Sequence, residues 1–404
     1  MNSKCLILYN NHLREYEYLL KIKNILINDF GVETIIHKRY PSSVLLKKAF
    51  MFRPNVILTY PLTSRGLSTE LYILKFLFKC KIIALRTEGV FNYENPMNLL
   101  RAAGQDIYGD NLIDFEVFWG PKSAKIIGKM LYDNNKISSL DRIKYFGYPK
   151  WEIHNFIDDI LLNLNRDIKK NLYEETLLFV TGFQVSSYDN KEKILYAKDI
   201  PIDDVSGVIK AAKLAKSFRK KLVQTINKAA KINPTTFYII KIHPLESQDD
   251  YNFVGNNIKV VHNTHKVSDL LMISDYFFHY GSTTAAEAFK LNKPVFYYYD
   301  VPLNEYFVDL KWPSNKKIII NNLQHFLTNK EFKNTSPISL SKSKEVLKDH
   351  FNYIEGEDYK PSFSIAKLIS DNMDIQTISF NDKYFLKSVI SIISKSLNIF
   401  KWKF

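Results

Sequence analysis

Short apolar runs alternate with longer amphipathic stretches, and this rhythm constrains the fold more than any other feature of the chain. Runs of four to six residues rich in β-branched side chains are typical of strands buried on both faces. In the first half such runs lie at residues 5–9, 33–37, 55–60, 81–85 and 143–146, and stretches with helical spacing lie at 13–30, 43–52 and 69–80. Strands and helices in alternation predict a parallel sheet covered by helices on both sides.

The same rhythm restarts after Gly147-Tyr148-Pro149, which punctuates the chain. Further strands are expected at 176–181, 236–242, 258–262, 276–280, 294–299 and 317–320, and a long helix at 208–231. A chain of 404 residues also exceeds what one core usually organises. We therefore predict two Rossmann-like, doubly wound α/β domains that face a cleft, at 1–165 and 166–340, and a C-terminal helical segment at 341–404.

The charge balance narrows the expected partners. Lys and Arg number 56 against 42 Asp and Glu, a formal net charge of +14. This excess suits phosphorylated donors, acidic glycans or an anionic membrane, although Lys-rich surfaces are equally common in proteins without such partners. No nucleic-acid-binding motif is visible, so nucleic acid is not expected as a partner.

Cysteine content and hydropathy indicate a compartment. The two cysteines, Cys5 and Cys80, lie in apolar segments and form neither a disulfide framework nor a zinc site. The N-terminal apolar run is too short for the core of a signal peptide, and no run of about 18 apolar residues is present. These features predict a cytoplasmic protein.

Residues that directly follow strands are the first candidates for a site, because ligands of open α/β sheets bind at the carboxyl ends of strands. The strand at 81–85 leads into Arg86, Thr87, Glu88 and Gly89. Glu88 is a candidate general base there, and Gly89 lets another group approach closely. Position alone slightly favours the structural alternative, in which Glu88 caps the next helix or pairs with Arg86.

The strand at 236–242 ends in Lys241-Ile242-His243-Pro244. Pro244 fixes the turn and leaves His243 at the strand tip, where an imidazole can donate to a phosphate oxygen or protonate a leaving group. Lys241, two residues earlier on the same face, would add positive charge. A single histidine is, however, more often a satisfied structural group.

The strongest segment joins the strand at 276–280 to a helix through Gly281, Ser282, Thr283 and Thr284. Free amides and the helix dipole at such a point bind a phosphate. Thr284 and Glu287 also have the spacing of a capping box, which is compatible with phosphate binding because other amides remain available.

Asn263 and Thr264 follow the strand at 258–262 and complete this set. Together with His243 and the 281–284 loop they predict a nucleotide monophosphate or diphosphate site in the second domain. No Asp-x-Asp motif lies at a strand end, so no metal and no obligatory cofactor is expected beyond a nucleotide-sugar co-substrate. The pair Asp249-Asp250 is interpreted as a solvated turn.

An ordered set of short motifs resembles the GT-B class of glycosyltransferases, specifically bacterial surface-carbohydrate proteins related to capsule Kdo transferases, bacterial sialyltransferases and CDP-glycerol polyol-phosphate transferases. The set is Glu88-Gly89, Phe118-Trp119-Gly120, Gly147-Tyr148-Pro149, His243-Pro244, and Gly281-Ser282-Thr283-Thr284 with Glu287-Ala288. The resemblance implies that Glu88 is the catalytic base and that His243 contacts the donor phosphate. It also implies that the hydroxyls of Ser282, Thr283 and Thr284 bind that phosphate. Sialyltransferases usually have two acidic residues before the Gly, whereas Thr87 precedes Glu88 here.

The resemblance predicts a glycosyltransferase that moves a CMP-activated ulosonic acid, Kdo or sialic-type, onto a bacterial surface polysaccharide or lipopolysaccharide. The acceptor would be a glycan or a lipid-linked glycan. The nearest alternative is a CDP-glycerol-type polyol-phosphate transferase. A nucleotide-sugar epimerase would need several carboxylates around the sugar, and Glu88 is the one obvious candidate in the first half. Outside enzymes, a surface-assembly scaffold that binds nucleotide-sugar or a basic RNA-binding protein remains open.

The last residues, 383–404, have apolar side chains at three- and four-residue spacing, interrupted by Lys387, Lys395, Lys401 and Lys403. This pattern predicts an amphipathic helix. Two placements are equally open: a peripheral contact with anionic lipid on the cytoplasmic face of the inner membrane, or packing on the first domain.

Overall fold

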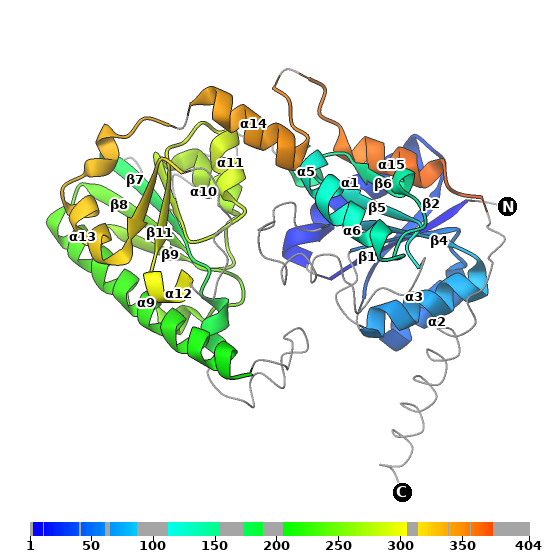
Figure 1. Cartoon of the computed structure of the whole chain (residues 1–404), viewed down its shortest axis with the longest axis horizontal. Helices are drawn as coiled ribbons and strands as arrows, with labels where there is room; N and C mark the ends of the chain where they lie inside the picture. Colours follow the sequence, from blue (N-terminus) through cyan, green and yellow to red (C-terminus); the bar gives the residue numbers. More distant parts are fainter. Residues whose placement is uncertain are drawn as a thin grey trace, which may run out of the picture. The chain divides into compact units, whose positions relative to one another are not determined.

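In the computed structural model the described residues are 3–10, 12–39, 42–60, 65–86, 112–152, 173–188, 205–304, 314–337, 339–355 and 357–374 (Figure 1). They form two compact units, one comprising Met1–Asn155 and Lys348–Phe404 and the other Phe156–Leu347. Each unit contains a six-stranded parallel sheet. The predicted pair of doubly wound α/β domains is therefore confirmed. The described residues from Lys348 onward belong to the first unit.

The first sheet has the strand order β2-β1-β3-β4-β5-β6. Its strands are β1 (Lys4–Tyr9), β2 (Glu33–Lys38), β3 (Val56–Thr59), β4 (Lys81–Leu85), β5 (Phe115–Phe118) and β6 (Ile143–Tyr145). Its helices are α1 (His12–Asn28), α2 (Ser42–Phe52), α3 (Arg65–Phe78), α5 (Pro121–Ser123), α6 (Lys129–Asp133) and α15 (Pro361–Ser370), while α14 (Leu340–Phe351) spans the unit boundary. Alternate residues of β1 face opposite helix layers: Leu6 packs with α2 and α3, and Ile7 with α1 and α15.

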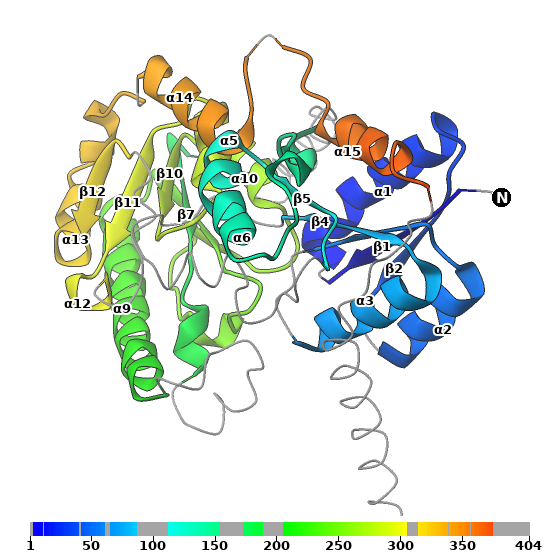
Figure 2. The ribbon, with the colours of Figure 1, turned by 45° about the vertical axis from the view of Figure 1, so that its right-hand side comes forward.

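The second sheet has the strand order β12-β11-β10-β7-β8-β9. Its strands are β7 (Glu175–Val180), β8 (Thr236–Lys241), β9 (Ile258–Val261), β10 (Tyr276–His279), β11 (Val295–Tyr299) and β12 (Lys316–Ile319). Its helices are α9 (Val205–Ile232), α10 (Val267–Ile273), α11 (Ala285–Lys290), α12 (Val301–Asn304) and α13 (Ile320–Thr328). Helices α9 and α13 lie together on one face, and α10 and α11 on the other (Figures 1 and 2).

Aromatic side chains stack across the core of the second sheet. Phe179, Phe278 and Phe296 lie in register on β7, β10 and β11. Their ring centroids are 4.5 Å and 4.7 Å apart, and neighbouring planes differ by 14° and 21°. Such offset stacks add to the free energy of burial. They hold together the strands whose carboxyl ends carry the candidate site.

Two motifs that supported the family resemblance pack the C-terminal segment onto the first unit. The Trp119 ring stacks on Tyr148 with centroids 3.9 Å apart, and Trp151 stacks on Phe351 at 4.5 Å. A Cβ atom at Gly120 would lie 2.3 Å from the backbone carbon of His350, so any larger residue would displace α14. Phe118-Trp119-Gly120 and Gly147-Tyr148-Pro149 therefore have a structural role.

Among the described residues, no helix is both long and apolar enough to cross a membrane. The predicted amphipathic helix at 383–404 lies outside the described residues, so both of its placements stay predictions.

Candidate functional site

The strand order of the second sheet creates a switch point between β7 and β10. The chain proceeds from β7 to β8 on one side and returns to β10 on the other. At such a point the loops diverge at the carboxyl edge and leave a crevice that binds ligands in open α/β sheets. The loops there begin after β7 at Thr181, after β8 at Ile242 and after β10 at Tyr280.

This topology brings together two of the predicted groups and separates a third. His243 and the 281–284 loop follow β8 and β10, the two neighbours of β7, and so lie about 10 Å apart at the sheet edge. Asn263 and Thr264 follow the edge strand β9, about 14 Å from β10, and both are exposed. Their predicted contact with the donor therefore requires a ligand that extends along the sheet edge.

His243 is held by three hydrogen bonds, two through its backbone and one through its ring. Its amide donates to Thr181 Oγ1 at 3.0 Å, and its carbonyl accepts from the Glu246 amide at 2.9 Å. Its Nδ1 accepts from the Leu245 amide at 3.2 Å. Because Nδ1 accepts, the neutral imidazole carries its proton on Nε2. Half-buried at the strand tip, this ring can donate from Nε2 to a phosphate oxygen.

The predicted neighbours of His243 differ in what they do. Pro244 is exposed in the turn. Lys241 is buried, and its Nζ donates to the carbonyl of His262, at the end of β9. Its charge therefore helps to join the ends of β8 and β9, a use that the strand pattern did not indicate.

The loop after β10 is ordered by its own hydroxyls. Gly281 has a φ of +58°, a left-handed conformation that favours glycine. The Ser282 amide donates to Nδ1 of the buried His279 at 3.2 Å. The hydroxyls of Ser282 and Thr284 are 2.7 Å apart, and the Thr284 amide donates to Ser282 Oγ at 3.3 Å.

The predicted capping box is not formed. Thr284 occupies the N-cap of α11 without a side-chain cap hydrogen bond, because its hydroxyl pairs with Ser282 instead. Glu287 is buried in the first turn of the helix, 7% exposed. The remaining sequence prediction for this loop, phosphate binding by Ser282, Thr283 and Thr284, stays a prediction.

A buried carboxylate that the sequence analysis missed lies behind His243. Glu246 is 3% exposed. Its Oε1 accepts from Thr181 Oγ1 at 3.0 Å and from the Phe183 amide at 2.9 Å, and its Oε2 accepts from the Tyr251 hydroxyl. Burial raises the pKa of Glu246, and hydrogen bonds from Tyr251, Phe183 and Thr181 oppose the rise. The available signal was its position three residues after His243.

Asp249 and Asp250 lie exposed in the 3₁₀ turn at Gln248–Asp250, as the sequence predicts, and Asp250 also makes an ion pair. This carboxylate pairs with Arg219 of α9 at 2.8 Å. Arg219 also donates to Ser186 Oγ at 2.9 Å and lies over the Tyr251 ring, 5.5 Å from its centroid. The pair thus anchors the residues around Glu246 to the helix layer.

In the first unit, Arg86 is engaged at the end of β4. It is 3% exposed, and its Nε lies 2.5 Å from Glu116 Oε1 on β5. Its carbonyl accepts from Trp119 Nε1 at 2.6 Å. Glu88, the predicted base, and Gly89, expected with Arg86 on the acceptor side, lie outside the described residues. The roles of all three residues stay predictions.

No protein-family model and no curated protein sequence matches this chain. Solved structures do match it. The S. aureus MnaA–UDP structure aligns with a TM-score of 0.56 at 12% identity, over 93% of this chain and 99% of that chain. A variant of the wall teichoic acid polymerase TagF aligns with a TM-score of 0.56 at 14% identity, over 92% and 89%.

A second TagF variant, soaked with CDPG, aligns with a TM-score of 0.53 at 12% identity, over 92% of this chain and 88% of that chain. Likeness at this identity shows the fold. The chain shares the two-domain α/β architecture of these structures, which is the architecture predicted from its strand and helix pattern.

Proposed function

We propose that this chain is a transferase that uses a nucleotide-activated donor, with the donor phosphate bound at the carboxyl edge of the second sheet. One observation carries the proposal: His243 and the 281–284 loop flank β7 at the switch point. A histidine that donates from Nε2, two hydroxyls and a loop that turns through Gly281 suit an anionic phosphate.

The chemistry follows from these groups together with the predicted base. Glu88 takes the proton of an acceptor hydroxyl, and the hydroxyl oxygen attacks the anomeric carbon of the donor sugar. The bond from that carbon to the nucleotide phosphate oxygen breaks, and the nucleotide leaves with the bonding electrons. Hydrogen bonds from His243 and the 281–284 loop stabilise the negative charge that develops on the phosphate. The reaction needs no metal ion and no cofactor beyond the nucleotide-activated co-substrate.

For the donor we propose a CMP-activated ulosonic acid, of the Kdo or sialic type. This choice rests on the resemblance of the His243-Pro244 and Gly281-Ser282-Thr283-Thr284 motifs to the surface-carbohydrate transferases. The acceptor would be a bacterial surface polysaccharide, a lipopolysaccharide or a lipid-linked glycan, and the net charge of +14 suits an anionic acceptor or membrane. The protein would work in the cytoplasm, with residues 383–404 as its contact with anionic lipid.

The second candidate is transfer of a polyol phosphate from CDP-glycerol. The observation that favours it is the structural likeness to TagF, which extends over 92% of this chain and includes a structure soaked with CDPG. Epimerisation of a UDP-sugar is the third, supported by the likeness to a putative UDP-N-acetylglucosamine 2-epimerase from Listeria monocytogenes, which aligns with a TM-score of 0.51 at 10% identity.

The deciding experiment offers the purified chain CMP-Kdo, CMP-sialic acid, CDP-glycerol and UDP-N-acetylglucosamine, each with a surface-glycan acceptor. We expect release of CMP from a CMP-activated ulosonic acid together with extension of the acceptor. Release of CMP from CDP-glycerol would select the polyol-phosphate reaction, and epimerised UDP-sugar without transfer would contradict the proposal. Nucleotide-sugar binding without turnover of any donor would favour a scaffold.

A further inference from the structure

We propose that Glu246 is a positioning residue that orders His243 by joining the loop after β7 to the loop after β8. The inference deepens the proposed function and rests on it, because His243 is the group that meets the donor phosphate.

The Glu246 carboxylate accepts hydrogen bonds from residues of both loops. Thr181 and Phe183, which follow β7, both donate to Oε1, at 3.0 Å and 2.9 Å. Tyr251, which follows the 3₁₀ turn at Gln248–Asp250, donates to Oε2. An ionised carboxylate is an acceptor only, so these three donors match its hydrogen-bonding capacity.

The Thr181 hydroxyl connects Glu246 to His243 through two hydrogen bonds. A threonine hydroxyl has a single hydrogen, and Thr181 donates it to Glu246. Its lone pairs are thereby turned toward the His243 amide, which donates to the same oxygen at 3.0 Å. The Glu246 amide closes the turn by donating to the His243 carbonyl at 2.9 Å. Glu246 therefore determines where both backbone polar groups of His243 lie.

A contribution to fold stability does not by itself explain why position 246 holds a buried carboxylate. Burying a charge costs free energy that hydrogen bonds only partly return, and apolar side chains of similar volume often stabilise a protein as well or better. A carboxylate does offer what an apolar side chain lacks, which is a directional link between two loops. Arg219, paired with Asp250 and lying over the Tyr251 ring, supports this link from α9.

The test is a double-mutant cycle between Glu246 and His243. Glu246→Gln keeps the size of the side chain but presents an amide NH₂ to groups that are themselves donors. If Glu246 acts through His243, we expect Glu246→Gln to lower kcat at least about tenfold in the wild-type background and less than about twofold in the His243→Ala background. If the loss of kcat in the double variant equals the product of the losses in the two single variants, the residues act independently and the proposal is overturned.

Thr181 provides a second probe with a conservative partner. Thr181→Val keeps the shape but removes the hydroxyl, and we expect it to lower kcat as Glu246→Gln does, whereas Thr181→Ser should restore most of the activity. The ¹⁵N chemical shifts of the His243 ring report which nitrogen carries the proton. In the wild type we expect the Nε2–H tautomer, and in Thr181→Val and Glu246→Gln we expect shifts that indicate a mixture of the two tautomers. Unchanged ring shifts in both folded variants would contradict the positioning role.

A matched control lies at the opposite edge of the same sheet. Glu175 is also a buried carboxylate, 6% exposed, and it contacts residues at the amino ends of the strands. Glu175→Gln should lower the unfolding midpoint and leave kcat unchanged.

If His243→Ala has wild-type turnover, the proposed function fails. If His243→Ala is inactive while Glu246→Gln and Thr181→Val keep wild-type turnover, only the role of Glu246 fails.

Discussion

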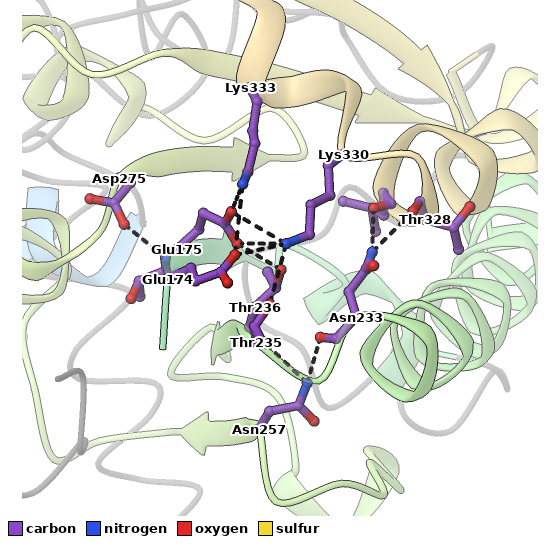
Figure 3. A network of polar contacts seen from close by, with 12 residues as sticks. Glu174, Glu175, Asn233, Thr235, Thr236, Asn257, Asp275, Thr328, Lys330 and Lys333 are labelled. Carbon is purple, nitrogen blue, oxygen red and sulfur yellow. Dashed lines mark hydrogen bonds and ion pairs between the residues drawn. The ribbon is translucent and has the colours of Figure 1, made fainter. Parts of the chain in front are cut away.

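The two edges of the second sheet use buried carboxylates in opposite ways. At the amino edge, Glu175 begins β7 and meets Lys330, Lys333 and Thr236 (Figure 3). At the carboxyl edge, Glu246 meets hydroxyls and an amide and has no lysine among its hydrogen-bond donors in the described residues. Both side chains are less than a tenth exposed.

The pKa values of the two carboxylates shift in opposite directions. Burial acts to raise the pKa of Glu175, but hydrogen bonds from Lys333, Thr236 and Lys330 outweigh it, so the pKa is lowered. Burial raises the pKa of Glu246, and the hydrogen bonds from its neutral donors do not overcome this effect. Near neutral pH the charged form of Glu175 therefore stabilises the fold, whereas that of Glu246 costs free energy.

Polar contacts at the amino edge join the elements that meet there. Asn257 donates to the carbonyls of Ala230, Asn233 and Thr236 at 3.0 Å, 3.2 Å and 2.9 Å, and Asp275 accepts from the Thr176 amide at 2.8 Å. These groups come from α9, β7 and β8 and from the segments before β8, β9 and β10. The amino edge therefore joins the strands and helices of the second unit, and the loops of the carboxyl edge are the ones that we propose bind the donor.

The largest expected effect is at the carboxyl edge. His243→Ala removes a donor to the phosphate and should lower kcat by roughly 10²- to 10³-fold and weaken CMP binding, because the leaving group loses a preorganised hydrogen bond. Donor turnover and calorimetric CMP titration measure the two effects. The melting temperature should stay near that of the wild type. A variant with normal turnover and a lowered melting temperature would make His243 a structural residue and remove the contrast between the edges.

The next effect is at the amino edge. Glu175→Gln should lower the free energy of unfolding by about 1–3 kcal/mol, because a buried acceptor for two lysines and a threonine is lost. The matched control is Glu174→Gln, since Glu174 lies 3.4 Å from Lys330 but its side chain is 60% exposed, and we expect about 0–1 kcal/mol from it. Denaturant titration measures both. Equal effects of the two substitutions would show that burial of Glu175 contributes little.

Lowering the pH should remove the stabilisation that Glu175 provides at the amino edge. Because the folded pKa of Glu175 lies below its unfolded value, its stabilisation is present above the unfolded pKa and is lost as the pH falls through the folded pKa. The wild type should therefore lose more stability below about pH 5 than Glu175→Gln does. Unfolding free energies measured from pH 7 to pH 3 check this. Parallel curves would contradict the assigned shift.

The smallest expected effect comes from a substitution in the 281–284 loop and tests whether this loop contacts the nucleotide. Gly281→Ala meets open space but needs a left-handed backbone, so it should cost about 1 kcal/mol of stability. Gly31→Ala in the first unit is a matched control, since Gly31 has a φ of +64° and also no neighbour within 4 Å. Both should lower stability equally, but only Gly281→Ala should weaken CMP binding severalfold. Equal CMP affinities in the two variants would separate the loop from the nucleotide.

The sequence predicts the strands well and their order poorly. Apart from β5, which was marked only by its end at Phe118, each strand begins and ends within one residue of its predicted range, because short apolar runs encode burial locally. The order depends on pairings such as Tyr276 with Leu177, far apart along the chain. Period and spacing carry no information about such partners.

The site shows the same division. His243 and Gly281 could be proposed from the sequence because a His-Pro pair and a glycine before hydroxyls are local signals. Glu246 was missed because its partner Thr181 lies 65 residues away, and the ion pair of Asp250 was not predicted because Arg219 belongs to another element. A polar residue in a loop is normally solvated, and only its tertiary contacts distinguish the buried Glu246 from such a residue.

The most direct test of the central claim is a crystal structure of this chain with CMP bound. The account predicts the phosphate at the carboxyl edge of the second sheet, with an oxygen within hydrogen-bonding distance of His243 Nε2 and others contacting the 281–284 loop. The Glu246–Thr181–His243 hydrogen bonds should be retained. A nucleotide bound elsewhere, with His243 and Ser282 untouched, would contradict it.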